Sequence, residues 1–226
     1  IRNHGENAAE EYGIENYSNI IGGNYRYTEL LAAIASEQFK KLEPILDHRK
    51  KMGAYLSKAL QGINGFTLPV EEKETLNCFY MYPIKFDQKL FGLSRNVFVQ
   101  AVSAELPPAK YWDTTPLAEG YIKPLYLNKI YEKKIALGTK GFPFNVNKDH
   151  SYNYSYGDCP ITENLYENQL MISPLIREGI FEKDLDDFVS AIFKVLDNID
   201  VLKSDSSVVE KKLMDPIEAI EKSVKT

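Results

Sequence analysis

The sequence contains few cysteines and no long hydrophobic segment. Cys78 and Cys159 are the only cysteines among 226 residues, which excludes a disulfide framework and a zinc site built from spaced cysteines. This scarcity fits a reducing compartment, so we expect a cytoplasmic protein. No apolar run approaches the roughly 18 residues that a membrane-spanning helix needs, and the first residues lack the pattern of a signal peptide. We therefore expect no membrane partner.

Positive charge is also in short supply. The chain has 27 lysines and arginines against 32 aspartates and glutamates, a net charge of −5. Because nucleic-acid-binding surfaces are normally basic, nucleic acid is excluded as a partner. With 44% hydrophobic and 26% charged residues, the composition is that of an ordinary globular protein, and its length suits one large domain or two small ones.

Complete catalytic motifs are missing as well. The sequence has no G-x-S-x-G, H-E-x-x-H, P-loop or Rossmann glycine pattern. Its three histidines, His4, His48 and His150, are too far apart for a metal-binding motif, and we expect them on the surface or in loops. The neighbouring carboxylates Asp186 and Asp187 are expected on the solvated side of a helix. No metal site is predicted.

One stretch, Gly22–Ala33, organises the rest of the chain. Two glycines end a polar, irregular segment, Asn24 and Arg26 follow, and Thr28 is a good N-cap for the apolar-periodic run that comes next. An amide and a guanidinium just ahead of a helix N-terminus are suited to hold an anion such as phosphate. The alternative is a purely structural turn before a capped helix.

Hydrophobic periodicity predicts an α/β protein with a small, mainly antiparallel sheet covered by helices. A helix from Thr28 to about Leu60 is expected to break near Pro44 and to stop at Gly62. Pro83 places its strand at a sheet edge or a bulge. The other predicted elements are strands at 66–68, 76–86, 109–112 and 169–173, and helices at 94–104, 128–136, 160–168, 181–199 and 216–225.

Two segments carry less regular patterns. Residues 113–158 are irregular but rich in aromatic residues, so we expect them to wrap around the domain or to cover a site rather than to be disordered. The short basic cluster 48–51 lies on the predicted long helix, and we expect it to form a solvated face.

The Gly22–Ala33 stretch resembles the signature G-x-N-x-R-x-S/T-E-x-x-A-A of the DegT/DnrJ/EryC1/StrS family of pyridoxal-phosphate-dependent sugar aminotransferases. Four further segments, at residues 2–5, 38–49, 120–126 and 159–165, resemble other parts of the family. The resemblance covers about residues 1–200. It implies the C-terminal small α/β domain of an aspartate-aminotransferase-type fold (the type I fold of pyridoxal-phosphate enzymes), together with a long interdomain helix.

The resemblance also implies a division of the chain. Residues 1–27 would be the tail of the large cofactor-binding domain, 28–62 the interdomain helix, 63–203 the small domain and 204–226 a charged tail. Because residue 1 is Ile, we expect the chain to be the C-terminal part of a longer polypeptide.

The family implies homodimers, with sites at the subunit interface, that transfer an amino group, usually from glutamate, to a nucleotide-linked keto sugar in polysaccharide or glycoside biosynthesis. Asn24 matches the residue that reaches the pyridoxal phosphate of the neighbouring subunit. Arg26 matches a residue placed to meet a substrate anion such as the donor's carboxylate. Tyr126 stands where many members have a substrate-binding histidine.

No lysine of this chain lies in the family's Ser-Phe-x-x-x-Lys context. We therefore assign no catalytic residue and expect the chain alone to be inactive. Two alternatives stay open: a non-catalytic dimerisation or scaffold module derived from this family, and a relative that aminates cyclitols or dehydrates a sugar.

Overall fold

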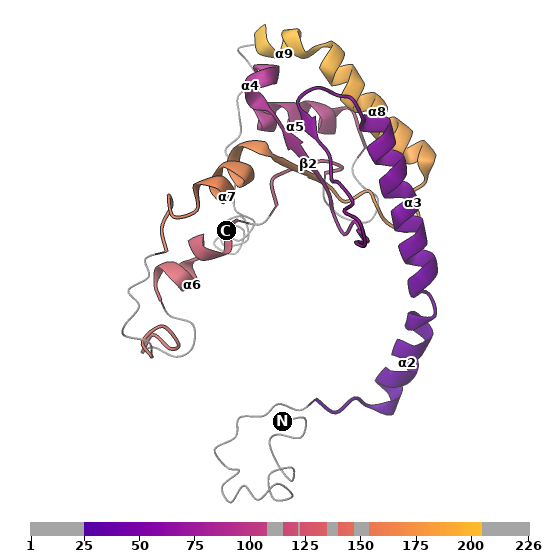
Figure 1. Cartoon of the computed structure of the whole chain (residues 1–226), viewed down its shortest axis with the longest axis vertical. Helices are drawn as coiled ribbons and strands as arrows, with labels where there is room; N and C mark the ends of the chain where they lie inside the picture. Colours follow the sequence, from indigo (N-terminus) through magenta and orange to yellow (C-terminus); the bar gives the residue numbers. More distant parts are fainter. Residues whose placement is uncertain (1–24, 108–114, 122, 135–139, 147–153, 205–226) are drawn as a thin grey trace, which may run out of the picture. The chain divides into compact units, whose positions relative to one another are not determined.

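A computed structural model describes residues 25–107, 115–121, 123–134, 140–146 and 154–204. By its internal contacts the chain divides into two compact units, residues 1–47 and 48–226. The elements of each unit are drawn in Figure 1. The predicted strand at 109–112, the predicted helix at 216–225, and His4 and His150 lie outside the described residues.

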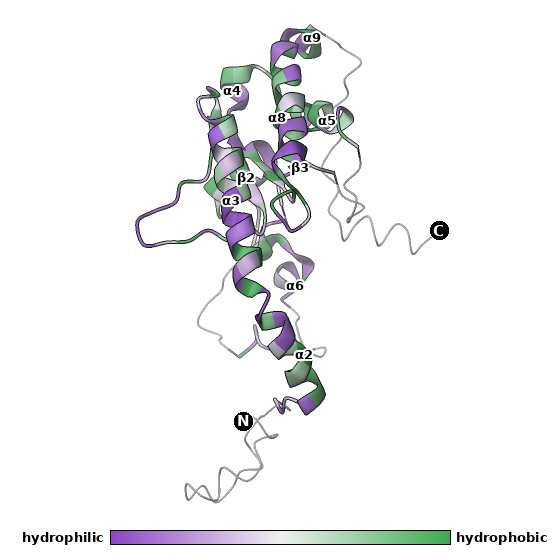
Figure 2. Cartoon of the chain, turned by 90° about the vertical axis from the view of Figure 1, so that its right-hand side faces the viewer, coloured by the Kyte–Doolittle hydropathy of each residue, from purple (hydrophilic) through white to green (hydrophobic). Residues whose placement is uncertain are grey.

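The first unit contains helix α2 (Glu29–Phe39). Thr28 is its N-cap, as predicted, and its side chain accepts a hydrogen bond from the backbone N–H of Leu31 at 3.3 Å. The apolar side chains of α2 are not buried: Leu30 is 72% and Phe39 74% exposed, and hydrophobic segments of α2 are coloured green in Figure 2. Within the described part of this unit, capping and backbone hydrogen bonds therefore hold the helix.

The predicted break near Pro44 is confirmed. Helix α2 ends at Phe39, Lys40 and Lys41 form a turn, and α3 (Leu42–Leu60) begins. Pro44 lies in the first turn of α3, where a missing N–H costs no intrahelical hydrogen bond. Gly62, at φ +87°, follows the end of α3, in the left-handed region that glycine enters without strain.

The described residues of the second unit form a four-stranded antiparallel sheet in the order β1-β2-β4-β3. The strands are β1 (Phe66–Thr67), β2 (Tyr82–Phe86), β3 (Ala118–Glu119) and β4 (Leu170–Ser173). This confirms the predicted small antiparallel sheet, although its strands are short.

The strand predicted over 76–86 is wrong in its first half. Only residues from Tyr82 onward pair, whereas Cys78 and Tyr80 are exposed. The Asn77 side chain accepts a hydrogen bond from the N–H of Phe79 at 2.8 Å, and Phe79 has φ +45°. Such a local side-chain bond competes with sheet pairing, so the chain turns instead of extending.

The prediction for Pro83 needs a correction too. Strand β2 lies between β1 and β4 rather than at an edge. However, β1 pairs only with Lys85 and Phe86, so among the described strands Pro83 has just β4 beside it, opposite Ile172. A proline is tolerated at position 83 because β1 does not extend this far, so no strand on that side needs a backbone N–H from residue 83.

Helices α3, α5 (Arg95–Ala104) and α8 (Glu182–Asp197) share one hydrophobic core with the sheet (Figure 1). Ser94 caps α5 as predicted, and the predicted apolar face of α8 is buried in this core, while Asp186 and Asp187 are exposed. The fully or nearly fully buried side chains include Leu56, Leu60, Tyr82, Ile84, Phe86, Phe98, Val102, Met171, Leu185, Phe188 and Ile192.

Shorter elements complete the second unit. They are α4 (Gln88–Phe91), the 3-10 turn η2 (Leu125–Leu127), α6 (Lys129–Glu132), α7 (Pro160–Asn164), the π-helical segment η3 (Leu165–Gln169) and α9 (Ile199–Ser204). The predicted helix at 128–136 is thus shorter than expected. None of the described helices is long and apolar enough to cross a membrane.

The basic cluster at 48–51 is not simply a solvated face. His48 Nε2 lies 2.8 Å from the carbonyl oxygen of Ile180, and Arg49 donates to the carbonyl of Phe79 at 3.1 Å. Irregular segments leave backbone carbonyls without partners, and these side chains satisfy two of them. The cluster therefore ties α3 to the adjoining loops.

Candidate functional site

Arg26 is the described member of the predicted anion-binding pair, and Asn24 lies outside the described residues. Arg26 is exposed and precedes the N-cap Thr28 by two residues. The first turn of α2 carries the positive end of the helix dipole. A guanidinium next to that end favours an anion, either a carboxylate or a phosphate.

Tyr126 lies in the second unit, whereas Arg26 belongs to the first. It is half-buried in η2, directly after Pro124 and Leu125. Its hydroxyl donates a hydrogen bond to the carboxylate of Glu163. The structure thus brings Tyr126 together with a carboxylate that the sequence had not singled out.

Glu163 is a buried carboxylate, only 3% exposed, in α7. Besides Tyr126 it accepts hydrogen bonds from the N–H of Gly157, at 2.9 and 3.0 Å, and of Cys159, at 3.3 Å. Cys159 is the N-cap residue of α7, so the carboxylate reaches back over the helix start much as in a capping box. The run Cys159–Glu163, with a proline at the first helical position, was the available signal in the sequence.

The surroundings of Tyr126 and Glu163 shift the pKa values of the two groups in opposite directions. Burial raises the pKa of the Glu163 carboxyl, but the hydrogen bonds from Tyr126 and from the N–H groups of Gly157 and Cys159 outweigh burial and leave the pKa below its usual value. Burial, and then the adjacent Glu163, raise the pKa of the Tyr126 hydroxyl far above its usual value. At neutral pH Tyr126 therefore keeps its proton, directs it to Glu163, and offers a ligand only an oxygen lone pair.

A second tyrosine–glutamate pair fixes the same region. Tyr156 donates to Glu167 in η3 at 2.8 Å, and this bond raises the pKa of the Tyr156 hydroxyl. Within the aromatic region 113–158, Tyr126 is thus anchored to α7 and Tyr156 to η3.

Arg95 is fully buried at the start of α5 and supports η3. Its guanidinium donates to the carbonyls of Tyr166, at 3.2 Å, Glu167, at 2.5 Å, and Leu170. A planar guanidinium suits this task because its donors fan out in fixed directions. This role could not be predicted from the sequence, because Arg95 resembles an ordinary polar residue after a helix cap.

The hydrogen-bond donors ahead of α2 suit the phosphate group of pyridoxal phosphate, the cofactor that the resemblance implies. Arg26 and the α2 N-terminus are suited to an anionic group such as a phosphate or a carboxylate. Asn24, the predicted phosphate ligand, lies outside the described residues. The described residues contain no group of three or more His, Cys, Asp or Glu side chains arranged to hold a metal ion.

Comparison with known proteins identifies relatives. Residues 1–144 match the DegT/DnrJ/EryC1/StrS aminotransferase family. The chain is 22% identical over 172 residues to the spore coat polysaccharide biosynthesis protein SpsC of Bacillus subtilis, a match that covers 76% of this chain and 37% of SpsC.

Solved structures share the fold. The aminotransferase from Psychrobacter cryohalolentis superposes with a TM-score of 0.61 at 18% identity, over 88% of this chain and 48% of that one. DesV of S. venezuelae superposes with a TM-score of 0.59 at 17% identity, over 87% and 42%. The chain thus spans less than half the length of these relatives.

These likenesses confirm the predicted fold class, a mixed α/β unit with a small antiparallel sheet as in type I pyridoxal-phosphate aminotransferases. The predicted signature also lies inside the matched region. The chain belongs to the DegT/DnrJ/EryC1/StrS aminotransferase family.

Proposed function

We propose that this chain is the C-terminal part of a pyridoxal-phosphate-dependent aminotransferase that moves an amino group from glutamate to a nucleotide-linked keto sugar. The observation that carries the proposal is the family match over residues 1–144, which includes Arg26 ahead of a capped helix. The relative SpsC is named for spore coat polysaccharide biosynthesis, which supports a role in making a polysaccharide or glycoside.

The division proposed for the chain follows the family. Residues 1–27 end the large domain, 28–62 form the interdomain helix, 63–203 form the small domain, and 204–226 are a charged tail. The enzyme works in the cytoplasm as a homodimer. The exposed apolar side chains of α2, among them Leu30 and Phe39, support the assignment of 28–62 as a helix that packs against another domain.

Each predicted site residue has a role in this proposal. Asn24 donates an amide hydrogen bond to the cofactor phosphate of the partner subunit. Arg26 binds the donor's carboxylate through two parallel N–H···O bonds. Tyr126, held in place by Glu163, offers its oxygen lone pair to a substrate hydroxyl. Pyridoxal phosphate, when bound, supplies the electron sink for amino transfer.

The test compares Arg26→Ala and Arg26→Lys with the control Lys58→Ala, which changes an exposed residue. All variants are made in a full-length enzyme, in which this chain follows a segment that carries the family's Schiff-base lysine. Amino transfer from glutamate to nucleotide keto sugars is followed by mass spectrometry. Two charge-assisted hydrogen bonds predict a rise of about 10- to 100-fold in the KM for glutamate on Arg26→Ala. An unchanged KM, or no amino transfer by the unmodified enzyme, would refute the proposal.

The chain by itself is a second test. Because none of its lysines has the family's Ser-Phe-x-x-x-Lys context, we expect no turnover and no single dominant lysine adduct after incubation with pyridoxal phosphate and reduction by borohydride. Stoichiometric labelling of one lysine together with amino transfer would contradict this expectation. If the natural product is this chain alone, its intact mass will show it, and the dimerisation or scaffold module becomes the better interpretation.

A further inference from the structure

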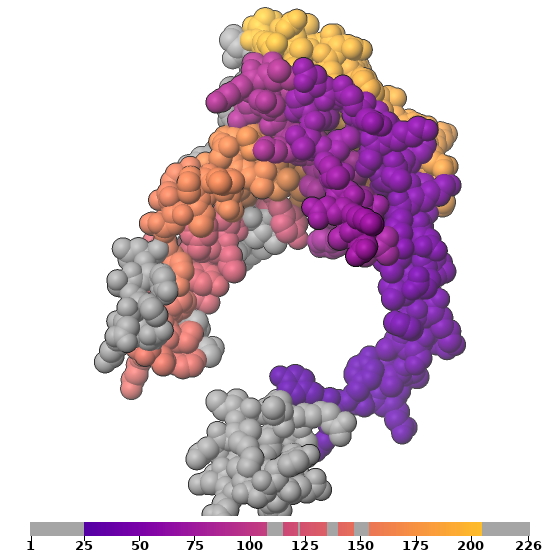
Figure 3. Space-filling view, in the orientation of Figure 1, coloured from indigo at the N-terminus to yellow at the C-terminus, as the bar shows by residue number. Residues whose placement is uncertain are grey.

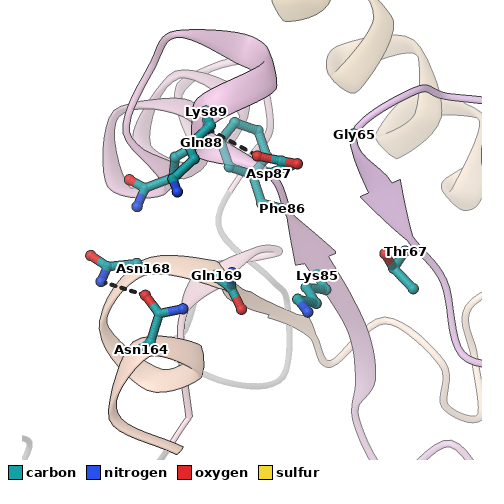
Figure 4. A pocket seen from close by; sticks show the side chains of 10 residues that line it. All are labelled: Gly65, Thr67, Lys85, Phe86, Asp87, Gln88, Lys89, Asn164, Asn168 and Gln169. Carbon is teal, nitrogen blue, oxygen red and sulfur yellow. Dashed lines mark hydrogen bonds between the residues drawn. The ribbon is translucent and has the colours of Figure 1, made fainter. Parts of the chain in front are cut away.

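A polar pocket of about 360 Å³ opens in the second unit, between α4 and η3, at the end of β2. Figure 4 shows Gln88 and Lys89 on one side and Asn164 and Asn168 on the other. In Figure 3 the magenta surface around α4 adjoins the orange surface of the segment that contains α7 and η3. The lining residues are Gly65, Thr67, Lys85, Phe86, Asp87, Gln88, Lys89, Asn164, Asn168 and Gln169.

Arg95, which is fully buried, supports both sides of this pocket. The backbone N–H of Arg95 donates to Gln88 Oε1 at 3.0 Å, while the Arg95 guanidinium holds the carbonyls of η3. The segment that carries Asn168 and Gln169 is a π-helix, a form that recurs at functional sites. One fully buried arginine therefore fixes the two sides of the pocket relative to each other.

The amide side chains offer both donors and acceptors. Because Gln88 Oε1 already accepts from Arg95, the Gln88 Nε2 group is the part that can donate to a ligand. Asn168 Nδ2 donates to Asn164 Oδ1 at 3.0 Å, which leaves the Asn164 amide as a donor and the Asn168 oxygen as an acceptor. Alternating donors and acceptors of this kind match the hydroxyl groups of a sugar.

The charge of the pocket is positive. Lys85 and Lys89 form no ion pair with any other described residue, and the one acidic residue, Asp87, uses its Oδ1 to cap the N–H groups of Lys89 and Leu90 at 3.0 and 3.1 Å. Thr67 lies directly across from Lys85 in the β1–β2 register and adds a hydroxyl. Two lysines against one aspartate give the lining a net positive charge, which favours a ligand that carries a phosphate.

We propose that this pocket binds a phosphorylated monosaccharide. Lys85 and Lys89 bind the phosphate, and Gln88, Asn164 and Asn168 bind the sugar hydroxyls. The volume lies at the lower end of the range for small-molecule sites, which suits a hexose phosphate better than a nucleotide. Arg26, Tyr126 and Glu163 are not among the lining residues, so this proposal does not depend on the proposed function.

The test is isothermal titration of the 226-residue chain with glucose 6-phosphate, with glucose and inorganic phosphate as comparison ligands. The first variant is the double substitution Lys85→Ala/Lys89→Ala. The second, Gln88→Glu, keeps the acceptor for Arg95 but replaces the amide donor with a negative charge. Lys58→Ala, at an exposed site on α3, is the matched control, and circular dichroism verifies that each variant is folded.

We expect glucose 6-phosphate to bind more tightly than either comparison ligand. Each lost charge-assisted hydrogen bond weakens binding by about 10-fold or more, so the double variant loses about 100-fold, Gln88→Glu loses at least 10-fold, and Lys58→Ala is unchanged. The proposal is overturned if millimolar glucose 6-phosphate does not bind, if the two pocket variants bind as the unmodified chain does, or if inorganic phosphate binds equally well.

Discussion

Arg95 offers the sharpest test of what holds the second unit together. The substitution Arg95→Met keeps an unbranched side chain of similar length in the fully buried site but removes every hydrogen-bond donor of the side chain. The carbonyl of Leu170 keeps a partner, because the N–H of Gly120 also donates to it at 2.7 Å. The carbonyls of Tyr166 and Glu167 and the Oδ1 atom of Asn96 lose the guanidinium.

The magnitude follows from these three acceptors. A buried acceptor that loses its donor costs about 1–3 kcal/mol; because the bond to Asn96 is buried and the two carbonyl bonds are part-buried, together they cost about 2–6 kcal/mol. We expect a loss of about 4 kcal/mol from the free energy of unfolding, a large share of the roughly 5–15 kcal/mol available to a typical domain. The matching fall in Tm is about 8–16 °C for a protein of this size.

Urea unfolding followed by circular dichroism at 222 nm measures the loss. Arg95→Lys keeps the charge but has a single donor group, so it should lose a smaller amount than Arg95→Met. The exposed Lys58→Met is the control and should change stability by less than about 0.5 kcal/mol. A loss below about 1 kcal/mol for Arg95→Met would show that the carbonyls of η3 do not depend on this side chain.

Two further predictions concern Glu163 and Gly53. The folded-state pKa of Glu163 is lowered. Its stabilising effect is therefore complete above the ordinary carboxyl pKa and disappears as the pH falls through the folded-state pKa. The difference between the urea midpoints at pH 7 and pH 3 should be smaller in Glu163→Gln than in the unmodified chain, and an equal difference would contradict this. A Cβ on Gly53 would lie 2.4 Å from the Phe79 ring. Gly53→Ala should therefore lower the free energy of unfolding by about 1–3 kcal/mol through overpacking, although alanine has the better helix propensity. A rise in Tm would contradict this prediction.

Local signals in the sequence predicted the helices well. The caps Thr28 and Ser94, the break shortly before Pro44 and the stop at Gly62 all lie where expected, because each acts within a few residues of its own position. Strand boundaries were less accurate, since the length of β2 depends on a local turn at Asn77 and on a partner strand far away in the sequence.

The candidate site divides in the same way. A linear signature sufficed to propose Asn24 and Arg26, because both residues belong to one short stretch of sequence before a helix. Tyr126 was predicted as a substrate ligand by position alone. That its proton is directed to Glu163, 37 residues away, could not be read from spacing, because no periodic pattern links the two residues.

By itself, the sequence determined the family and the order of most helices and strands, and it predicted an anion-binding pair ahead of α2, because all of these are written in short stretches. Only the tertiary structure decided which polar groups are buried together. Arg95 meets η3 across more than 70 residues of sequence, and the polar pocket joins α4, β2 and η3. Such sites depend on how distant segments pack, and packing is a property of the folded chain.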